Sequence, residues 1–438
     1  MNLPEKFRNA PATAESVYTW DIRSFFKNKA LLALIDTAVK HNSDLLIAVK
    51  NIASSEAVLK KVKLNYLPEL NGQLAGNHTI SSKNSLAGVG NEQFIGKRDV
   101  EDFTASLGLS WEIDIWGRIR REKEEALAVY MQSQEVKKAV QTKLVADVAN
   151  GYYNLLMLDE QLEIAKKNRS LSDSTVQLIQ IQYKVGEASN LAIQQAKAQL
   201  EMTKQLIPQI EQSIALQENA LSLLCGSYAG AVKRKAQPAE EFGYQQNDAY
   251  PVSILSARPD IRVAEFALRA ANANAGVAQA AMYPALTITA SGGLNSFKSS
   301  NWFTIPGSLF GVVAGGITQP VFQRRKLKTQ YDQAVIEREK AVISFRQAVL
   351  QGYAQVSDAL ISKQKLDEQY VAAENREIQL SAGINTAGIL FRTGMANYLE
   401  IITANNNYLQ SRLQTVELYK NKAAARIELY RALGGGWQ

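Results

Sequence analysis

Hydrophobic and polar residues alternate without interruption from Phe103 to Ile115. Thirteen alternating residues exceed the five or six of a typical strand, and alternation places every second side chain on one face of a sheet. The apolar positions are Phe103, Ala105, Leu107, Leu109, Trp111, Ile113 and Ile115. Alternation is weaker near residues 70–80 and 286–291, and the glycine-rich run 309–322 is assigned as a strand only by its place in an internal repeat. We therefore predict four strands, at about residues 66–80, 102–117, 284–297 and 308–322.

Two very long helices are also predicted. From Gly117 to Gly186 the chain is rich in Ala, Gln, Glu, Lys and Leu, and no proline lies between Pro68 and Pro208. At 1.5 Å per residue, such a helix would be about 100 Å long. The return helices have an apolar residue at every seventh position, which is typical of a coiled-coil seam. These residues are Ile193, Leu200, Ile207, Ile214 and Leu221, and Ile402, Leu409, Val416, Ala423 and Tyr430. The sequence predicts antiparallel helical hairpins at 118–226 and 324–433, with tips near residues 186 and 394.

The chain repeats itself with a period near 208 residues. Tyr183-Lys184-Val185-Gly186 is matched by Phe391-Arg392-Thr393-Gly394, and Leu223-Leu224-Cys225-Gly226 by Ala432-Leu433-Gly434-Gly435. Each copy has the same order: a helical stretch, a strand pair and a long hairpin. The opening helical stretches are predicted at 30–64 and 259–281. We therefore expect a first repeat at 1–230, a connector at 231–250 and a second repeat at 251–438.

Composition excludes several classes of function. Cys225 is the only cysteine, and His41 and His78 are the only histidines, so a disulfide and Cys- or His-rich metal sites lack the residues they need. The net charge of +7 is small for 438 residues and does not indicate a nucleic-acid partner. No phosphate-binding GxxxxGK, no GxSxG and no His-bearing metal motif is present, so we expect no enzyme activity, no metal site and no cofactor.

The predicted strands are compatible with either a water-soluble protein or a membrane protein. No apolar stretch reaches the ~18–20 residues of a transmembrane helix, but a tilted strand of ~9–11 residues can also span a bilayer. Trp111, Trp116 and Phe322 lie toward one end of the predicted strands, where aromatic residues would contact a membrane interface. Four strands are too few to close a barrel, so copies would have to combine, as a dimer with eight strands or a trimer with twelve. The alternatives are a water-soluble hairpin and a soluble coiled-coil scaffold.

Three motifs resemble the TolC-type outer-membrane efflux proteins, in particular their lipoprotein branch. They are Trp111-Glu112-Ile113-Asp114-Ile115-Trp116-Gly117-Arg118; Ala257-Arg258-Pro259-Asp260-Ile261-Arg262-Val263-Ala264-Glu265; and Arg392-Thr393-Gly394 through Tyr398-Leu399-Glu400. The resemblance covers nearly the whole chain. It implies a mainly helical homotrimer with a twelve-stranded transmembrane β-barrel, four strands per protomer, and a tunnel of long coiled-coil helices. It also implies that residues 231–250 connect the repeats in an equatorial region.

The same resemblance implies a function. Such proteins are passive exit ducts in the outer membrane of Gram-negative bacteria, with a large periplasmic part and contact with outer-membrane lipid. Their partners would be a periplasmic membrane-fusion adaptor and an inner-membrane transporter, here expected to be of the RND type. The cargo would be drugs, metals or other small molecules. Type I protein secretion is the alternative function within this class of channel.

The resemblance also assigns roles to residues. The helical tips that contact the adaptor would comprise Val185, Gly186, Glu187, Thr393, Gly394 and Met395. Glu400 lies just past the second tip, where family members often carry an acidic residue facing the pore. Three copies around an axis would form an acidic constriction. In the first repeat the equivalent position is near Ala192, so the ring would come from the second repeat alone.

Lipoprotein members of this family begin at an acylated cysteine, which this chain lacks near Met1. We therefore expect the chain to be the trimmed mature part of a protein that is lipid-anchored in its natural form.

Overall fold

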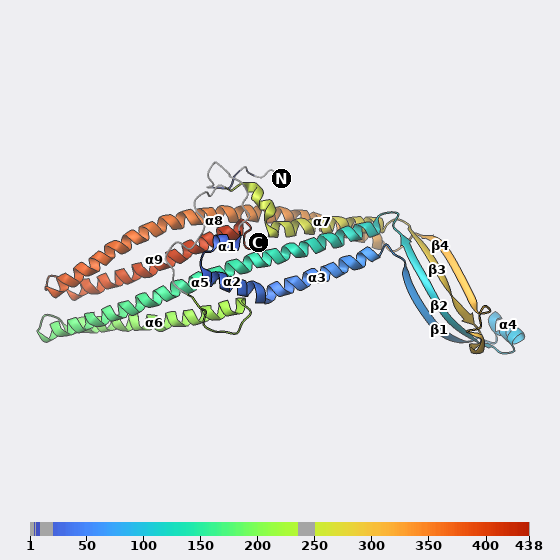
Figure 1. Cartoon of the computed structure of the whole chain (residues 1–438), viewed down its shortest axis with the longest axis horizontal. Helices are drawn as coiled ribbons and strands as arrows, with labels where there is room; N and C mark the ends of the chain where they lie inside the picture. The colour runs from blue at the N-terminus through green and yellow to red at the C-terminus, as the bar shows by residue number, and fades with distance from the viewer. Residues whose placement is uncertain (1–3, 5, 9–20, 235–249, 438) are drawn as a thin grey trace. The chain divides into compact units, whose positions relative to one another are not determined.

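The computed structural model describes residues 4, 6–8, 21–234 and 250–437 (Figure 1). The described part is mainly helical and contains one four-stranded sheet, which confirms the predicted fold class. The first half contains α1 (Ile22–Phe25), α2 (Lys29–His41), α3 (Ser43–Leu64), β1 (Glu69–Ile80), α4 (Leu86–Ile95), β2 (Asp99–Ile113), α5 (Arg118–Lys184) and α6 (Asn190–Leu224). The second half contains the short helix η1 (Val252–Ala257), α7 (Pro259–Ala280), β3 (Ala285–Ser296), the short helix η2 (Ser299–Asn301), β4 (Leu309–Thr318), α8 (Lys326–Arg392) and α9 (Tyr398–Ala432). None of the described helices is both long and apolar enough to cross a membrane.

The two copies of the repeat build helices of equal length. The long helices α5 and α8 have 67 residues each, and the return helices α6 and α9 have 35 each. Each hairpin reverses at a glycine with positive φ, Gly186 at 82° and Gly394 at 72°, a region that residues with a Cβ rarely adopt. The helices run antiparallel in each pair (Figure 1), as the seven-residue spacing predicted.

The helical stretch predicted at 30–64 is divided into two helices. Asn42 leaves the helical conformation between α2 and α3, and its side-chain oxygen accepts a hydrogen bond from the Leu45 N–H at 3.1 Å. Its amide group donates to the carbonyl of Leu224 at 3.0 Å. Asn42 therefore caps α3 and satisfies a free carbonyl at the end of α6, which explains the break.

The chain forms two compact units, each assembled from segments that are distant in sequence. The first comprises residues 1–51, 133–264 and 345–438, and the second comprises residues 52–132 and 265–344. In the first unit, Leu31 and Ile35 of α2 and Tyr152 of α5 belong to one buried apolar core. Phe25 stacks on Tyr430 of α9 with ring centroids 4.2 Å apart. The opening helices are thus anchored on the long hairpins by aromatic and aliphatic packing.

The second unit contains the sheet. Its strands follow the order β1-β2-β3-β4, and every neighbouring pair is antiparallel. The register places Leu107 of β2 opposite Gly72 and Gly292, and Gly292 opposite Gly311. Since this register is fixed across all four strands, it determines which side chains share a face.

Candidate functional site

One face of the sheet is apolar across all four strands. In register with Leu107 and Leu109 lie the following residues of the other strands: Leu70, Gly72 and Leu74; Leu286, Ile288, Ala290, Gly292 and Leu294; and Leu309, Gly311, Val313, Gly315 and Ile317. The opposite face carries mostly small and polar residues, among them Asn71, Gln73, Ser106, Thr287, Thr289 and Ser291. Leu107 is 60% exposed and Val313 80% exposed in the isolated chain. An exposed apolar face of this extent needs an apolar environment.

The aromatic residues predicted to border a membrane lie close to one end of this sheet. The indole N–H of Trp111 donates to the carbonyl of Tyr66 at 3.0 Å. Trp116, which follows β2, donates to the carbonyl of Pro284 at 2.8 Å and stacks on Tyr283 with ring centroids 4.9 Å apart. Rings with one satisfied polar atom and an apolar body suit a membrane–water interface. Phe322 follows β4 and is 85% exposed.

The sequence interpretation missed a second aromatic cluster, at the other end of the strands. Trp302 packs against Phe103 with ring centroids 5.4 Å apart and against Phe303 at 4.9 Å. Its indole N–H donates to the carbonyl of Leu294 at 3.4 Å. Phe103 and Trp111 are eight residues apart on β2, which is about 26 Å at the rise of a strand. The adjacent pair Trp302-Phe303 between two predicted strands was the signal available in the sequence.

The motif that leads from β2 into α5 builds a charged junction. Both Asp114 carboxylate oxygens accept backbone N–H groups of α5, from Ile119 and Arg120, at 2.9 Å. Arg118 donates to Glu112 at 2.7 and 2.9 Å and to Glu122 at 2.5 Å. A carboxylate at a helix N-terminus satisfies free N–H groups and complements the helix dipole. The junction therefore fixes the direction in which the long helix leaves the strand.

The tips of both hairpins present exposed residues above a small buried core. Val185 and Met395 are 66% and 77% exposed, and a Cβ placed on either tip glycine would meet no atom within 4 Å. Beneath them, Ile179, Phe391, Ala192 and Ile401 are buried together. The Gln182 amide donates to the Phe391 carbonyl at 3.4 Å, which joins the two hairpins. The Thr393 hydroxyl donates to the carbonyls of Ile389 and Leu390 near the end of α8, at 3.1 and 3.0 Å. Glu187 follows Gly186 in the first tip and is exposed.

Glu400 is exposed in the first turn of α9. Its backbone N–H is capped by the Asn397 side chain at 3.1 Å, and the Asn397 amide donates to its carboxylate at 3.5 Å. The carboxylate therefore lies at the positive end of the helix dipole. Glu400 lines a cavity of about 550 Å³, together with residues that include Leu380, Gly383 and Asn407.

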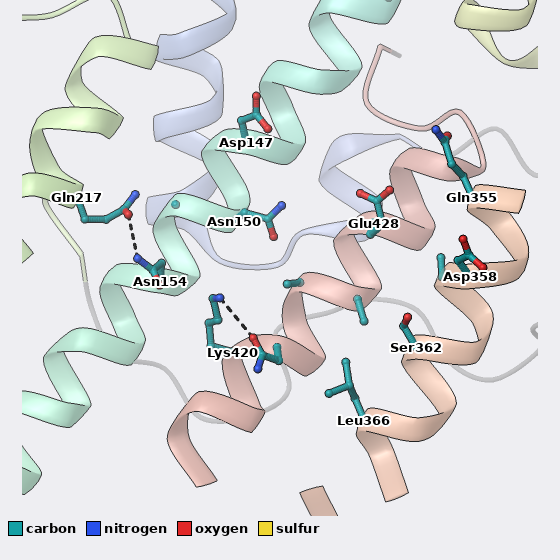
Figure 2. Close-up of a pocket in the computed structure, with 15 residues that line it drawn as sticks. Asp147, Asn150, Asn154, Gln217, Gln355, Asp358, Ser362, Leu366, Lys420 and Glu428 are labelled. Carbon is teal, nitrogen blue, oxygen red and sulfur yellow. Dashed lines mark hydrogen bonds between the residues drawn. The ribbon is translucent and has the colours of Figure 1, made fainter. Parts of the chain in front are cut away.

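A larger polar cavity, which the sequence interpretation did not find, lies farther along the same hairpins. It has a volume of about 830 Å³ and is lined by Asp147, Asn150 and Asn154 of α5, Gln217 of α6, Gln355, Asp358 and Ser362 of α8, and Lys420, Asn421 and Glu428 of α9. Figure 2 shows these side chains gathered between the helices, with Asn154 donating to Gln217 at 2.9 Å. Burial raises the pKa of Asp147. In the described ranges, no group of three or more His, Cys, Asp or Glu residues could hold a metal ion.

A sheet with one continuous apolar face, in the same chain as two hairpins of very long helices, is typical of outer-membrane channels with a helical duct. The chain belongs to the outer membrane efflux protein family, whose pattern matches residues 34–227 and 250–435.

Two curated relatives and one solved structure illustrate the similarity. The cation efflux system protein CusC of Escherichia coli O6:H1 is 28% identical over 445 residues, covering 100% of this chain and 94% of CusC. The solvent efflux pump outer membrane protein SrpC of Pseudomonas putida is 30% identical over 416 residues, covering 95% of this chain and 87% of SrpC. A crystal structure of CusC superimposes with a TM-score of 0.89 at 27% identity, covering 99% of this chain and 97% of that one. The chain is therefore an outer-membrane efflux protein.

Proposed function

We propose that this chain forms the exit duct of a tripartite efflux system and conducts small molecules passively from a periplasmic adaptor and an inner-membrane pump to the exterior. The observation that carries the proposal is the register of the sheet, in which four strands from both repeats turn their apolar residues to one face and mostly small and polar ones to the other. Such a sheet can face lipid on one side and water on the other. The family membership supports the same function.

The duct is a homotrimer in this proposal. Within the described residues, β1 and β4 each have only one paired edge, and unpaired backbone groups are very unfavourable in lipid. Joining β4 of one copy to β1 of the next removes every free edge. Three copies supply twelve strands and place six long helical hairpins around one axis. The aromatic clusters around Trp111 and Trp302 then mark the two membrane interfaces.

Each predicted site residue has a role in this assembly. The exposed tips, with Val185, Gly186 and Glu187 in one hairpin and Thr393, Gly394 and Met395 in the other, contact the adaptor, which links the duct to an RND-type transporter. Glu400 faces the pore and forms an acidic ring. Catalysis, cofactors and nucleic acid have no part in the proposed function.

The acidic ring is tested by Glu400→Ala in planar bilayers. Removal of three carboxylates from a constriction should weaken cation selectivity and raise conductance. Unchanged selectivity and conductance would contradict the ring and leave the duct itself unaffected.

The cargo is proposed to be small molecules, since relatives are named for cation and solvent efflux. Protein secretion through a type I system is the second candidate, because one duct can serve either transporter. Deletion of the gene distinguishes small-molecule efflux from type I protein secretion. We expect cells to accumulate metal cations, toluene or antibiotics from a test panel, because relatives are named for efflux of these classes, and we expect reversal when the gene is restored. Unchanged accumulation across the panel, together with loss of a secreted protein, would favour type I secretion.

A further inference from the structure

Polar residues follow one another at seven-residue spacing along one stripe of each helix in the second hairpin. On α9 they are Glu400, Asn407, Gln414, Asn421 and Glu428; on α8 they are Gln355, Ser362, Gln369 and Arg376, followed by Gly383. Since helices in a coiled coil repeat every 3.5 residues per turn, positions seven apart share a face. Glu400, Asn407 and Gly383 line the cavity near the tip, and Asn421, Glu428, Gln355 and Ser362 line the larger one. Both cavities therefore open on the same face of this hairpin.

Arg376 lies on this face between the two cavities. Its guanidinium donates to the Gln414 side chain at 2.6 Å and to the Ser411 hydroxyl at 3.2 Å. No carboxylate of the described residues forms an ion pair with it. Arg412, two residues from Gln414, differs from Arg376 in its ion pairs and in the face of the hairpin on which it lies. It pairs with Glu377 at 2.7 Å and with Glu160 at 3.1 Å, and it lines a separate cavity with Tyr153 and Tyr419.

We next consider the other charged residues that face the same side as Arg376 and Gln414. On α5, the positions that follow Asp147 at seven-residue spacing are uncharged, namely Asn154, Gln161, Asn168, Thr175 and Gln182. On α9, Glu417 occupies the register of Thr403 and Ala424, which line the two cavities, and so faces the same side. Lys420, one turn farther along α9, lines the larger cavity and offsets the charge of Glu417. Fourteen residues separate Glu400 from Gln414, about 21 Å along the helix. That distance exceeds the Debye length of about 8 Å at physiological salt, so Glu400 and Arg376 act on a passing ion separately.

We propose that Arg376 is a specificity-determining residue of the conduction path, held by Gln414 and Ser411 so that its positive charge opposes the cation preference created by Glu400. The proposal rests on the proposed function, in which the face bearing Glu400 lines the pore. Three symmetry-related copies of Arg376 would form a positively charged ring, farther from the tip than the acidic ring of Glu400. An ion entering at the tip is then selected by two rings of opposite sign.

The test is the reversal potential of the full-length protein in planar bilayers under a KCl gradient. Arg376→Gln should raise the permeability ratio of K⁺ to Cl⁻ by about twofold or more, because it removes one positive charge per copy from the face that bears Glu400. Glu400→Gln should shift the ratio in the opposite direction. Arg376→Lys keeps the charge and should retain the wild-type ratio.

Arg412→Gln is the matched control, since it removes the same charge at the same level of the hairpin but on another face. It should leave the ratio unchanged. If Arg376→Gln has the wild-type permeability ratio while Glu400→Gln shifts it, the role of Arg376 is overturned and the proposed channel function still stands. Equal shifts in Arg376→Gln and Arg412→Gln would also overturn it, since position would not matter. Wild-type protein that forms no conducting pore would overturn the proposed function itself.

Discussion

Arg258 shows how much one residue of a sequence motif can hold together. It is 3% exposed and donates to the carbonyl of Ala432 at 2.6 Å, to the Gln355 side chain at 2.6 Å and to Asp260 at 2.6 and 3.0 Å. It therefore joins the start of α7 to the middle of α8 and the end of α9. The sequence placed Arg258 in a motif that resembles a family pattern. Its partners, 97 and 174 residues away along the chain, could only be found in the folded structure.

Replacing Arg258 by Gln should lower the free energy of unfolding by about 3 kcal/mol, because a buried carbonyl and a carboxylate lose their partner. The measurement is urea unfolding of the detergent-solubilised protein. Arg269→Gln in α7, the helix that follows Arg258, is the control: its pair with Glu265 is exposed, so the change should stay within about 0.5 kcal/mol. Equal effects in the two variants would contradict the role given to Arg258.

The same ion pair predicts a dependence on pH. Burial alone would raise the pKa of Asp260, but the hydrogen bonds and charge of Arg258 outweigh burial and lower it. A lowered pKa in the folded state contributes stability that is present above the ordinary pKa of an aspartate, about 3.9, and is lost as the pH falls through the lowered value. In Arg258→Gln burial is no longer outweighed, so this loss of stability at low pH should be smaller than in the wild type or absent. Identical pH profiles of the unfolding midpoint would contradict the coupling.

At the scale of elements, helices were predictable and their interruptions were not. Proline-free composition and seven-residue spacing predicted the long hairpins, because both act locally. The break at Asn42 depends on Leu224, which lies 182 residues away. The turn into α8 shows the same limit. Gly117 has positive φ before α5, whereas Arg324 and Arg325 have φ of 50° and 65° before α8, positions where glycine would be less strained.

The sheet was predictable by alternation in β2 and only by the repeat in β4. The glycine-rich β4 has little alternation of its own, yet its register with β3 turns Leu309, Val313 and Ile317 to the apolar face. The cavities lay beyond prediction for a related reason. Their linings combine residues of two to four helices, and no local pattern marks such a set.

The apolar face predicts the effect of a charge placed on it. Leu107→Arg, near the middle of β2, should disfavour insertion into vesicles by about 2–4 kcal/mol, since a charge on the lipid-facing side is costly at the bilayer midplane. Ser106→Arg is adjacent in sequence but lies on the other face, and should insert nearly as well as the wild type. Equal insertion of the two variants, measured by urea titration in vesicles, would show that this face does not meet lipid.

The tip glycines predict a separation of function from stability. Gly394→Ala should cost about 1–2 kcal/mol of local strain at positive φ and should impair efflux, while the melting temperature changes little. Gly388→Ala is the control, because Gly388 lies within α8 with open space around its Cα and the exchange favours a helix. Accumulation of an efflux substrate in complemented cells gives the readout. Full activity of Gly394→Ala would contradict a tip that needs its precise turn.

At the scale of the whole molecule, one chain is an incomplete structure. Within the described residues, the sheet has two free edges and an exposed apolar face, and the proposed trimer would pair both edges. The sequence alone could exclude a four-stranded barrel but could not choose between two and three copies. A soluble coiled-coil scaffold would explain the seven-residue spacing, but it would not explain why all four strands share one exposed apolar face.

The most direct test of the duct is negative-stain electron microscopy of the detergent-extracted protein, with its mass determined in parallel. The proposed assembly predicts a trimer, seen from the side as a narrow cylinder longer than the about 100 Å of a single long helix, and from the end as a hollow three-fold ring. A monomer or dimer that stays in solution without detergent and shows no hollow end view would contradict it.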